Sequence, residues 1–112
     1  MQFLLIVLNK VEMLDPLLEK LMQHNVKGAT ILNSTGMIRE LSKHSEDIPL
    51  FGALRFLIDP SRQESKTIFM VLRDEKVEEV KGVIREVIGD LSQPDTAVVF
   101  TLPVSSAEGV EL

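Results

Sequence analysis

The stretch KGATILNSTGM, residues 27–37, decides how this chain is organised, because it joins a short strand to a long interruption. Gly28 opens a strand-like run over residues 29–35, and Gly36 closes it. From Met37 to Lys66 the sequence turns irregular. An interruption of this length is uncommon in a small domain unless it has a function or a structure of its own. We therefore expect the strand to be scaffold and residues 37–66 to be the functional part.

Size and composition predict a single folded domain over residues 1–112. The chain is 45% hydrophobic and 26% charged, which is typical of a globular protein. Its net charge of −5 argues against nucleic acid as the main partner, because phosphate binding needs a concentrated basic surface. There is no cysteine, so disulfides and thiolate metal sites are excluded, in keeping with a cytoplasmic location. The apolar run at residues 3–8 is too short to span a bilayer and lacks the flanks of a signal peptide.

Three further strands and two helices follow from the pattern of apolar residues. Strands are predicted over residues 3–8, 67–72 and 96–102, and the unbroken apolarity of the first indicates cover on both faces. One helix is expected after residue 14, with Asp15 as its cap and Pro16 at its first position, although helical turns can begin near Val11. The second is expected to start at a capping Asp74 and to stop at Gly89.

The resulting order is strand, helix, strand, long insert, strand, helix, strand. It predicts an α+β fold, a ferredoxin-like βαββαβ sandwich with the insert (37–66) between the second and third strands and a tail (105–112) without a clear element. Two helices cover one face of such a sheet, so strands that are apolar on both sides leave the other face exposed. Large apolar patches usually become interfaces, and we expect a homo-oligomer whose sheets pack together.

The insert has two parts. Residues 37–47, MIRELSKHSED, suggest a short helix or turn with solvated charges. Residues 48–60, IPLFGALRFLIDP, carry apolar side chains at helical spacing. Two interpretations stay open: this segment packs on its own or a neighbouring subunit, or it moves and docks on a ligand or partner.

Together with this order of elements, three segments resemble the PII nitrogen-regulatory family: KGATILNSTGM, the helix DEKVEEVKGVIREVIG and the strand ending FTLPV. The resemblance covers roughly residues 2–36 and 67–104. It implies a homotrimer that binds a small effector in clefts between subunits, either an adenine nucleotide, as in the family, or another anionic metabolite. It also implies that residues 37–66 stand in place of the mobile T-loop, which docks on a regulated enzyme or membrane transporter.

Candidate ligand-binding residues come from this resemblance and from the few available cations. Gly28 and Thr30 match the family's K-G-x-T turn, whose threonine lies beside the adenine, and the arginines of the insert are the best anion ligands left. The alternative for the arginines is a surface role, balancing nearby carboxylates. The positions assigned to an inter-subunit cleft are Gly28, Thr30, Gly36, Met37, Arg39, Arg55, Gly89 and Asp90.

The sequence also departs from the family. The glycine-rich GDGK loop that holds phosphates is replaced by GDLSQPD, which lacks the lysine and includes a proline without an N–H. The family's two C-terminal arginines are missing from VSSAEGVEL, and there is no tyrosine to modify. The resemblance therefore supports a sensor architecture further than it supports any one ligand.

Catalysis and metal binding are not expected. The two histidines, His24 and His44, lack a metal-binding spacing, and no hydroxyl has a paired base in the sequence. His44 with Glu46 and Asp47 is a weaker metal candidate, and a solvated loop explains these residues more simply. The main alternative to a regulator is a CutA-type trimeric scaffold of the same superfamily without a regulated ligand, and a degenerate enzyme ranks last.

Overall fold

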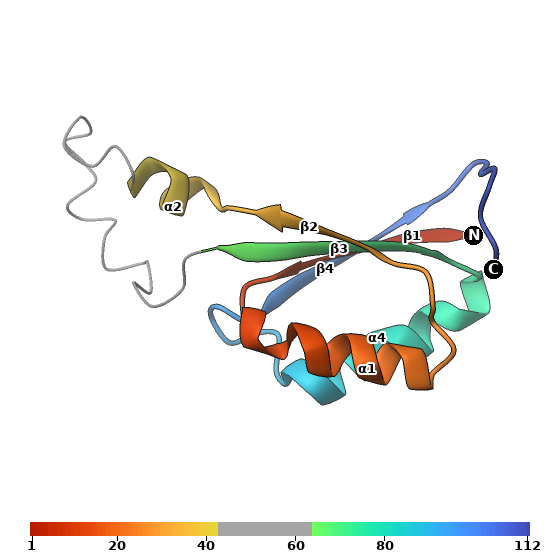
Figure 1. Cartoon of the computed structure of the whole chain (residues 1–112), viewed down its shortest axis with the longest axis horizontal. Coiled ribbons are helices and arrows are strands. Elements are labelled where there is room, and N and C mark those ends of the chain that lie inside the picture. The colour runs from red at the N-terminus through yellow and green to blue at the C-terminus, as the bar shows by residue number, and fades with distance from the viewer. Residues whose placement is uncertain (43–63) are drawn as a thin grey trace.

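The computed structural model describes residues 1–42 and 64–112 (Figure 1). Its strands are β1 (Gln2–Leu8), β2 (Thr30–Ser34), β3 (Ser65–Leu72) and β4 (Ala97–Pro103). Its α-helices are α1 (Leu14–Gln23), α2 (Met37–Ser42) and α4 (Val77–Ile88), and 3₁₀ turns η1 (Val11–Met13) and η4 (Asp74–Lys76) precede α1 and α4.

The strands form one sheet in the order β2-β3-β1-β4, and all neighbouring pairs are antiparallel. Helices α1 and α4 lie side by side on one face, whereas α2 lies beyond the end of β2, off this two-layer body (Figure 1). The predicted α+β class and the predicted order of elements are confirmed. The insert was predicted to run to Lys66, but β3 begins at Ser65, so its last two residues belong to the strand.

Strand β1 lies between β3 and β4 and has two different faces. Leu4, Ile6 and Leu8 are fully buried beneath the helices. The alternate side chains Phe3 and Leu5 point to the opposite face and stay partly exposed. The single chain covers one face of this strand because both long helices pack on the same side, as expected from two helices, and cover of the second face by another copy stays a prediction.

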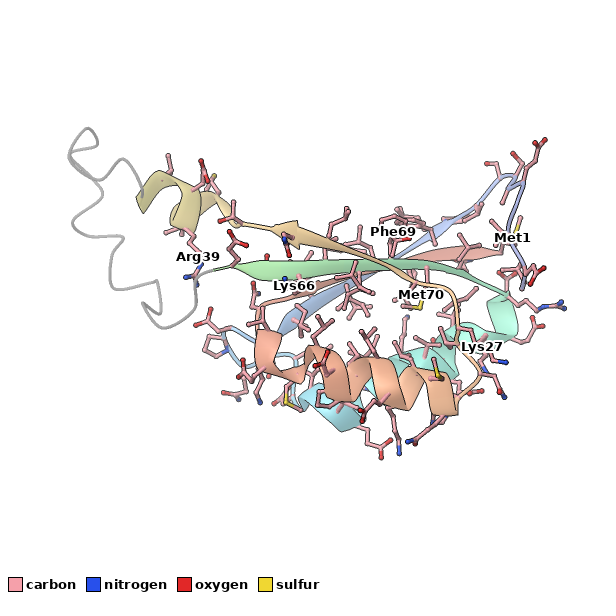
Figure 2. All side chains as sticks on the ribbon, viewed as in Figure 1. Met1, Lys27, Arg39, Lys66, Phe69 and Met70 are labelled. Atoms are coloured by element: carbon pink, nitrogen blue, oxygen red, sulfur yellow. The ribbon has the colours of Figure 1, made fainter. Side chains whose placement is uncertain are left out.

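The hydrophobic core forms between the sheet and the two long helices. Leu17 and Leu21 of α1 and Val80 and Ile84 of α4 contribute buried side chains at helical spacing. Figure 2 shows the alternation on β3, where Met70 points toward the helices and Phe69 points away. Burial of each such side chain contributes about 1.5–3 kcal/mol, so this layer supplies the main driving force for folding.

The helix starts differ from the predicted caps. Helix α1 begins at Leu14, so Asp15 lies in its first turn, and no side-chain hydrogen bond caps either helix. Asp74 lies in η4, where its carboxylate is 2.9 Å from the Met1 amine; hydrogen bonding to this amine lowers the pKa of Asp74. The 3₁₀ turns replace side-chain caps, because their i→i+3 backbone bonds lead the chain into each helix. The expectation that helical turns begin near Val11 is confirmed.

Polar contacts join the two long helices at their solvent edge. His24 Nδ1 lies 2.9 Å from the Glu79 carboxylate, and Lys20 Nζ lies 3.3 Å from that of Glu86. The hydrogen bond from Lys76, and then the one from His24, lower the pKa of Glu79. The tail after β4 forms no helix or strand, as predicted, and Arg73 donates a hydrogen bond to the Leu112 carbonyl.

Two glycines of α4 have opposite roles. Gly89 ends the helix with φ 96° and ψ −152°, a backbone region essentially limited to glycine. This confirms the predicted stop. Gly82 lies inside the helix, and a Cβ built there meets no atom within 4 Å.

We expect Gly82→Ala to stabilise the protein by about 0.5–1 kcal/mol, because alanine loses less conformational freedom in a helix. Gly89→Ala is the matched control and should destabilise it by about 1–3 kcal/mol through backbone strain. Urea unfolding followed by circular dichroism measures both changes. A loss of stability in Gly82→Ala would show that a neighbouring molecule needs the space at this position.

Candidate functional site

A cavity of about 350 Å³ opens at the end of the sheet where the chain leaves β2. Five of the eight described lining residues are polar or charged, and α2 contributes two apolar side chains. The described residues that line it are Asn9, Gly36, Met37, Ile38, Arg39, Glu64, Ser65 and Asp95.

The antiparallel register explains why distant parts of the sequence meet here. Leu8, the last residue of β1, pairs with both Lys66 and Ala97, close to the starts of β3 and β4. Ser34 at the end of β2 pairs with Ser65. The residues just outside these strand ends therefore surround one space. Asn9 is fixed there because its backbone N–H donates to the Thr96 carbonyl at 2.9 Å.

A cluster of hydroxyl groups forms one wall of the cavity. Ser65 is only 5% exposed, and its hydroxyl donates to the Ser34 carbonyl at 3.1 Å. The two serine Oγ atoms are 2.7 Å apart, and the Thr67 hydroxyl donates to Ser34 Oγ at 2.8 Å. These hydroxyls satisfy one another, which holds the start of β3 against the end of β2.

The charged groups among the described lining residues are one guanidinium and two carboxylates. Arg39 is half-buried and lies on the side of α2 that faces the start of β3 (Figure 2). Within the described parts of the chain, the carboxylates of Glu64 and Asp95 make no hydrogen bond or ion pair. The backbone of Asp95 is left-handed (φ 58°), which aspartate tolerates better than most residues. The described lining therefore carries two negatively charged carboxylates and one positively charged guanidinium.

The structure places the predicted ligand residues in three locations. Gly36, Met37 and Arg39 lie together in the cavity lining. Gly89 and Asp90 lie at the same end of the molecule but do not line the cavity.

The remaining predicted residues are separated from this group. Gly28 and Thr30 lie at the other end of β2. Arg55 falls outside the residues that the structure describes, as do Arg62 and the possible metal group of His44, Glu46 and Asp47. Lys66, the cation at the end of the predicted insert, donates a hydrogen bond to the Asn33 side chain.

Asp90 closes the turn between α4 and β4. Its carboxylate accepts hydrogen bonds from the Ser92 hydroxyl at 2.7 Å and from the Ser92 backbone N–H at 2.9 Å. These bonds, that of the hydroxyl first, lower the pKa of Asp90. The contacts of Asp90 therefore show that its carboxylate stabilises this turn, a common role for aspartate.

Several lining residues were not predicted, among them Asn9, Glu64 and Ser65. Asn9 directly follows β1, Glu64 directly precedes β3, and Ser65 begins β3, all at the same end of the sheet. The signal for Asn9 is its position as the first polar residue after β1, next to the strand ends that flank the insert. Finding it requires the strand register, which pairs residues about sixty positions apart.

We expect Asp90→Ala to lower the Tm at pH 7, because the turn loses its carboxylate acceptor. Folding lowers the pKa of Asp90, so the ionised carboxylate stabilises the fold above the unfolded-chain pKa of about 3.9. This contribution is lost as the pH falls through the lower folded-state pKa. Thermal unfolding from pH 7 to pH 3 should show the deficit shrinking below about pH 4.

Glu108→Ala is the control for this series. Glu108 is exposed in the tail, and its side chain makes no hydrogen bond or ion pair with the described residues. It should leave the Tm unchanged at every pH. A deficit in Asp90→Ala that is constant with pH would contradict a role for the ionised group.

Comparison with known proteins identifies the fold rather than a function. No family model matches the chain, and no curated protein matches it. Among solved structures the chain is similar to a functionally unknown protein from Pediococcus pentosaceus ATCC 25745, with a TM-score of 0.62 and 18% identity over 97% of this chain and 96% of that one. Because 129 solved chains match, the fold is widely shared, and a fold alone does not specify an activity.

Searches for metal and membrane features gave no candidate in residues 1–42 and 64–112. No group of three or more His, Asp or Glu side chains there could hold a metal ion. No helix in these two segments has the length and apolar character needed to cross a membrane.

Proposed function

We propose that this chain is a divergent PII-like regulatory protein of the cytoplasm. It forms a homotrimer, binds a small effector in clefts between subunits, and regulates an enzyme or membrane transporter of nitrogen-related metabolism rather than catalysing a reaction. A ferredoxin-like βαββαβ arrangement is part of this proposal. The sheet order β2-β3-β1-β4 and the packing of α1 and α4 on one face support it.

The observation that carries the proposal is the sheet surface opposite the helices, called here the open face. The register aligns apolar side chains across it, with Leu5 between Phe69 and Phe100. None of the open-face side chains is charged. They are Phe3, Leu5, Val7, Thr30, Leu32, Ser34, Ser65, Thr67, Phe69, Val71, Val98, Phe100 and Leu102.

This face is exposed in the single chain. Phe100 and Leu102 are 53% and 55% exposed, and the rings of Phe3 and Phe69 stack with centroids 5.4 Å apart. Four strands of five to eight residues at about 4.8 Å spacing give a flat area on the order of 400 Å². A patch of that size is comparable with the largest on monomeric proteins and marks an interaction surface.

The polar groups of the open face do not oppose its burial. The hydroxyls of Ser34, Ser65 and Thr67 already bond to one another. A second sheet packed on this face therefore leaves no charge and few hydroxyls without a partner. Copies of the same chain supply such a sheet, which supports self-association.

A cleft between copies also accounts for the two separated groups of candidate residues. Thr30 and Gly36 are six residues apart along an extended strand, so about 20 Å separates the two ends. One small ligand does not touch both groups within one chain. Packing of copies can place the Gly28–Thr30 turn of one subunit beside the Gly36–Arg39 segment of another.

A CutA-type scaffold without a regulated ligand is the second candidate. It requires the same self-association, so the open face supports both. The turn before β4 favours the scaffold, because it lies where the PII family binds phosphates. Pro94 lacks an N–H there, and Asp95 adds a carboxylate. Ligand binding distinguishes the two.

We expect Phe100→Asp to dissociate the oligomer to the 12.5 kDa chain, because it buries a charge in the interface. Met22→Asp is the matched control, since Met22 is a comparably exposed apolar residue (62%) on α1. Light scattering at low micromolar concentration measures both. A wild-type monomer, or dissociation by Met22→Asp alone, would contradict an interface on the open face.

We expect a ligand screen by thermal unfolding to find an effector that raises the Tm. A ligand at about a hundred times its Kd stabilises the native state by about 2.7 kcal/mol. The screen includes adenine nucleotides, 2-oxoglutarate and bicarbonate, and Arg39→Ala should weaken any binding. An intact trimer that responds to no ligand would favour the scaffold.

A further inference from the structure

We propose that the cavity beside the start of β3 binds a free α-amino acid or a close zwitterionic analogue. This inference rests on the proposed function, because it names the chemical class of effector for the same site. Three features of the described lining carry it: two carboxylates without partners, one guanidinium, and the apolar surface of Met37 and Ile38. Together they match an ammonium group, a carboxylate and a short side chain.

The carboxylates define one end of the ligand. Glu64 and Asp95 reach the cavity from opposite sides of the sheet end, since one precedes β3 and the other precedes β4. In the described residues no cation is paired with either. Ionised carboxylates are acceptors only, and an ammonium group presents three donors. An ammonium group placed between them restores the charge balance that the protein itself leaves open.

The same two carboxylates disfavour a phosphate. A triphosphate or a dicarboxylate would bring further negative charge beside Glu64 and Asp95, and like charges at close range repel. The described part of the lining contains one guanidinium and no lysine. The excess of one negative charge among these described residues favours a ligand that contributes at least one positive group.

Arg39 defines the other end of the ligand. A guanidinium carries five N–H donors in a planar fork, so it can hold a carboxylate in a bidentate geometry while keeping another contact. Arg39 is half-buried on α2 and faces the start of β3 (Figure 2). A bare divalent cation fits less well, because this positive group lies within the same lining.

Size and the remaining lining agree with a small ligand. A volume of about 350 Å³ lies near the lower end of the range for small-molecule sites. Met37 and Ile38 provide apolar surface for a side chain, and the Asn9 amide provides both a donor and an acceptor. Ser65 is buried and held by Ser34, so this wall is already formed before a ligand binds.

Calorimetry and thermal unfolding of the full chain against the common L-amino acids test this proposal. For the best binder, the matched amine without the carboxylate and the matched acid without the amine are measured as well. We expect one or a few amino acids to bind and both truncated analogues to bind at least about tenfold more weakly, because each loses a charge-assisted contact.

Variants locate the binding in this cavity. Asp95→Asn and Glu64→Gln should each weaken the amino acid about tenfold or more, and Arg39→Gln should do the same. Asparagine also tolerates the left-handed backbone of residue 95, so Asp95→Asn should remain folded. Glu19→Gln is the control, because Glu19 is an exposed carboxylate on α1 away from the cavity, and it should leave the affinity unchanged.

The outcomes separate this proposal from the proposed function. A trimer that binds a nucleotide or another anion but no amino acid overturns the amino-acid assignment and leaves the regulator in place. Binding of the amine alone with undiminished affinity, displacement by Mg²⁺ or Ca²⁺, or indifference to the Asp95 and Glu64 variants also overturns it. The wild-type ligand panel decides the question even where a variant fails to fold.

Discussion

The structure depends on one constraint: both long helices pack on the same face of a sheet whose central strand is apolar on both sides. Leu4, Ile6 and Leu8 are removed from water by α1 and α4, whereas Phe3 and Leu5 are not. Folding of the single chain thus buries the apolar side chains of one sheet face and leaves those of the other face partly exposed to water. The neighbouring strands continue the same division, since Ile68 and Met70 are buried and Phe100 and Leu102 are exposed. The proposed self-association would complete this burial and would also create clefts between subunits in which a ligand site can form.

The antiparallel pairing that builds the core also builds the candidate site. Because β1 pairs with both β3 and β4, the end of β1 lies beside the starts of the other two strands. Polar residues just outside the strands, Asn9 and Asp95 among them, then converge without belonging to a sequence motif. The site is therefore a property of register, and α2 at the root of the insert adds Arg39 to it. The site combines Ser65, held on the sheet by paired hydroxyls, with residues of α2 in the connection between β2 and β3. Binding residues often lie on such connecting segments, which a rigid scaffold positions.

Much of the fold was predictable from local pattern, and much of the site was not. The strands and helices followed from apolar runs and helical spacing, and Gly89 ended α4 where expected. The caps at Asp15 and Asp74 were wrong because backbone 3₁₀ bonds start these helices, and such bonds leave no side-chain signal. Gly36, Met37 and Arg39 were found because they adjoin the insert in sequence. Glu64 and Asp95 join them only through the register of three strands, and Thr30 was separated from them by the length of β2.

The absence of charge on the open face has a consequence for how copies would adhere. Contacts built from aliphatic and aromatic side chains are barely screened by sodium chloride, so ionic strength should hardly loosen them. Apolar hydration weakens as a driving force on cooling. An assembly joined through Leu5, Phe69 and Phe100 would therefore be more stable at growth temperature than at low temperature. Its subunits would dissociate and exchange most readily on cooling.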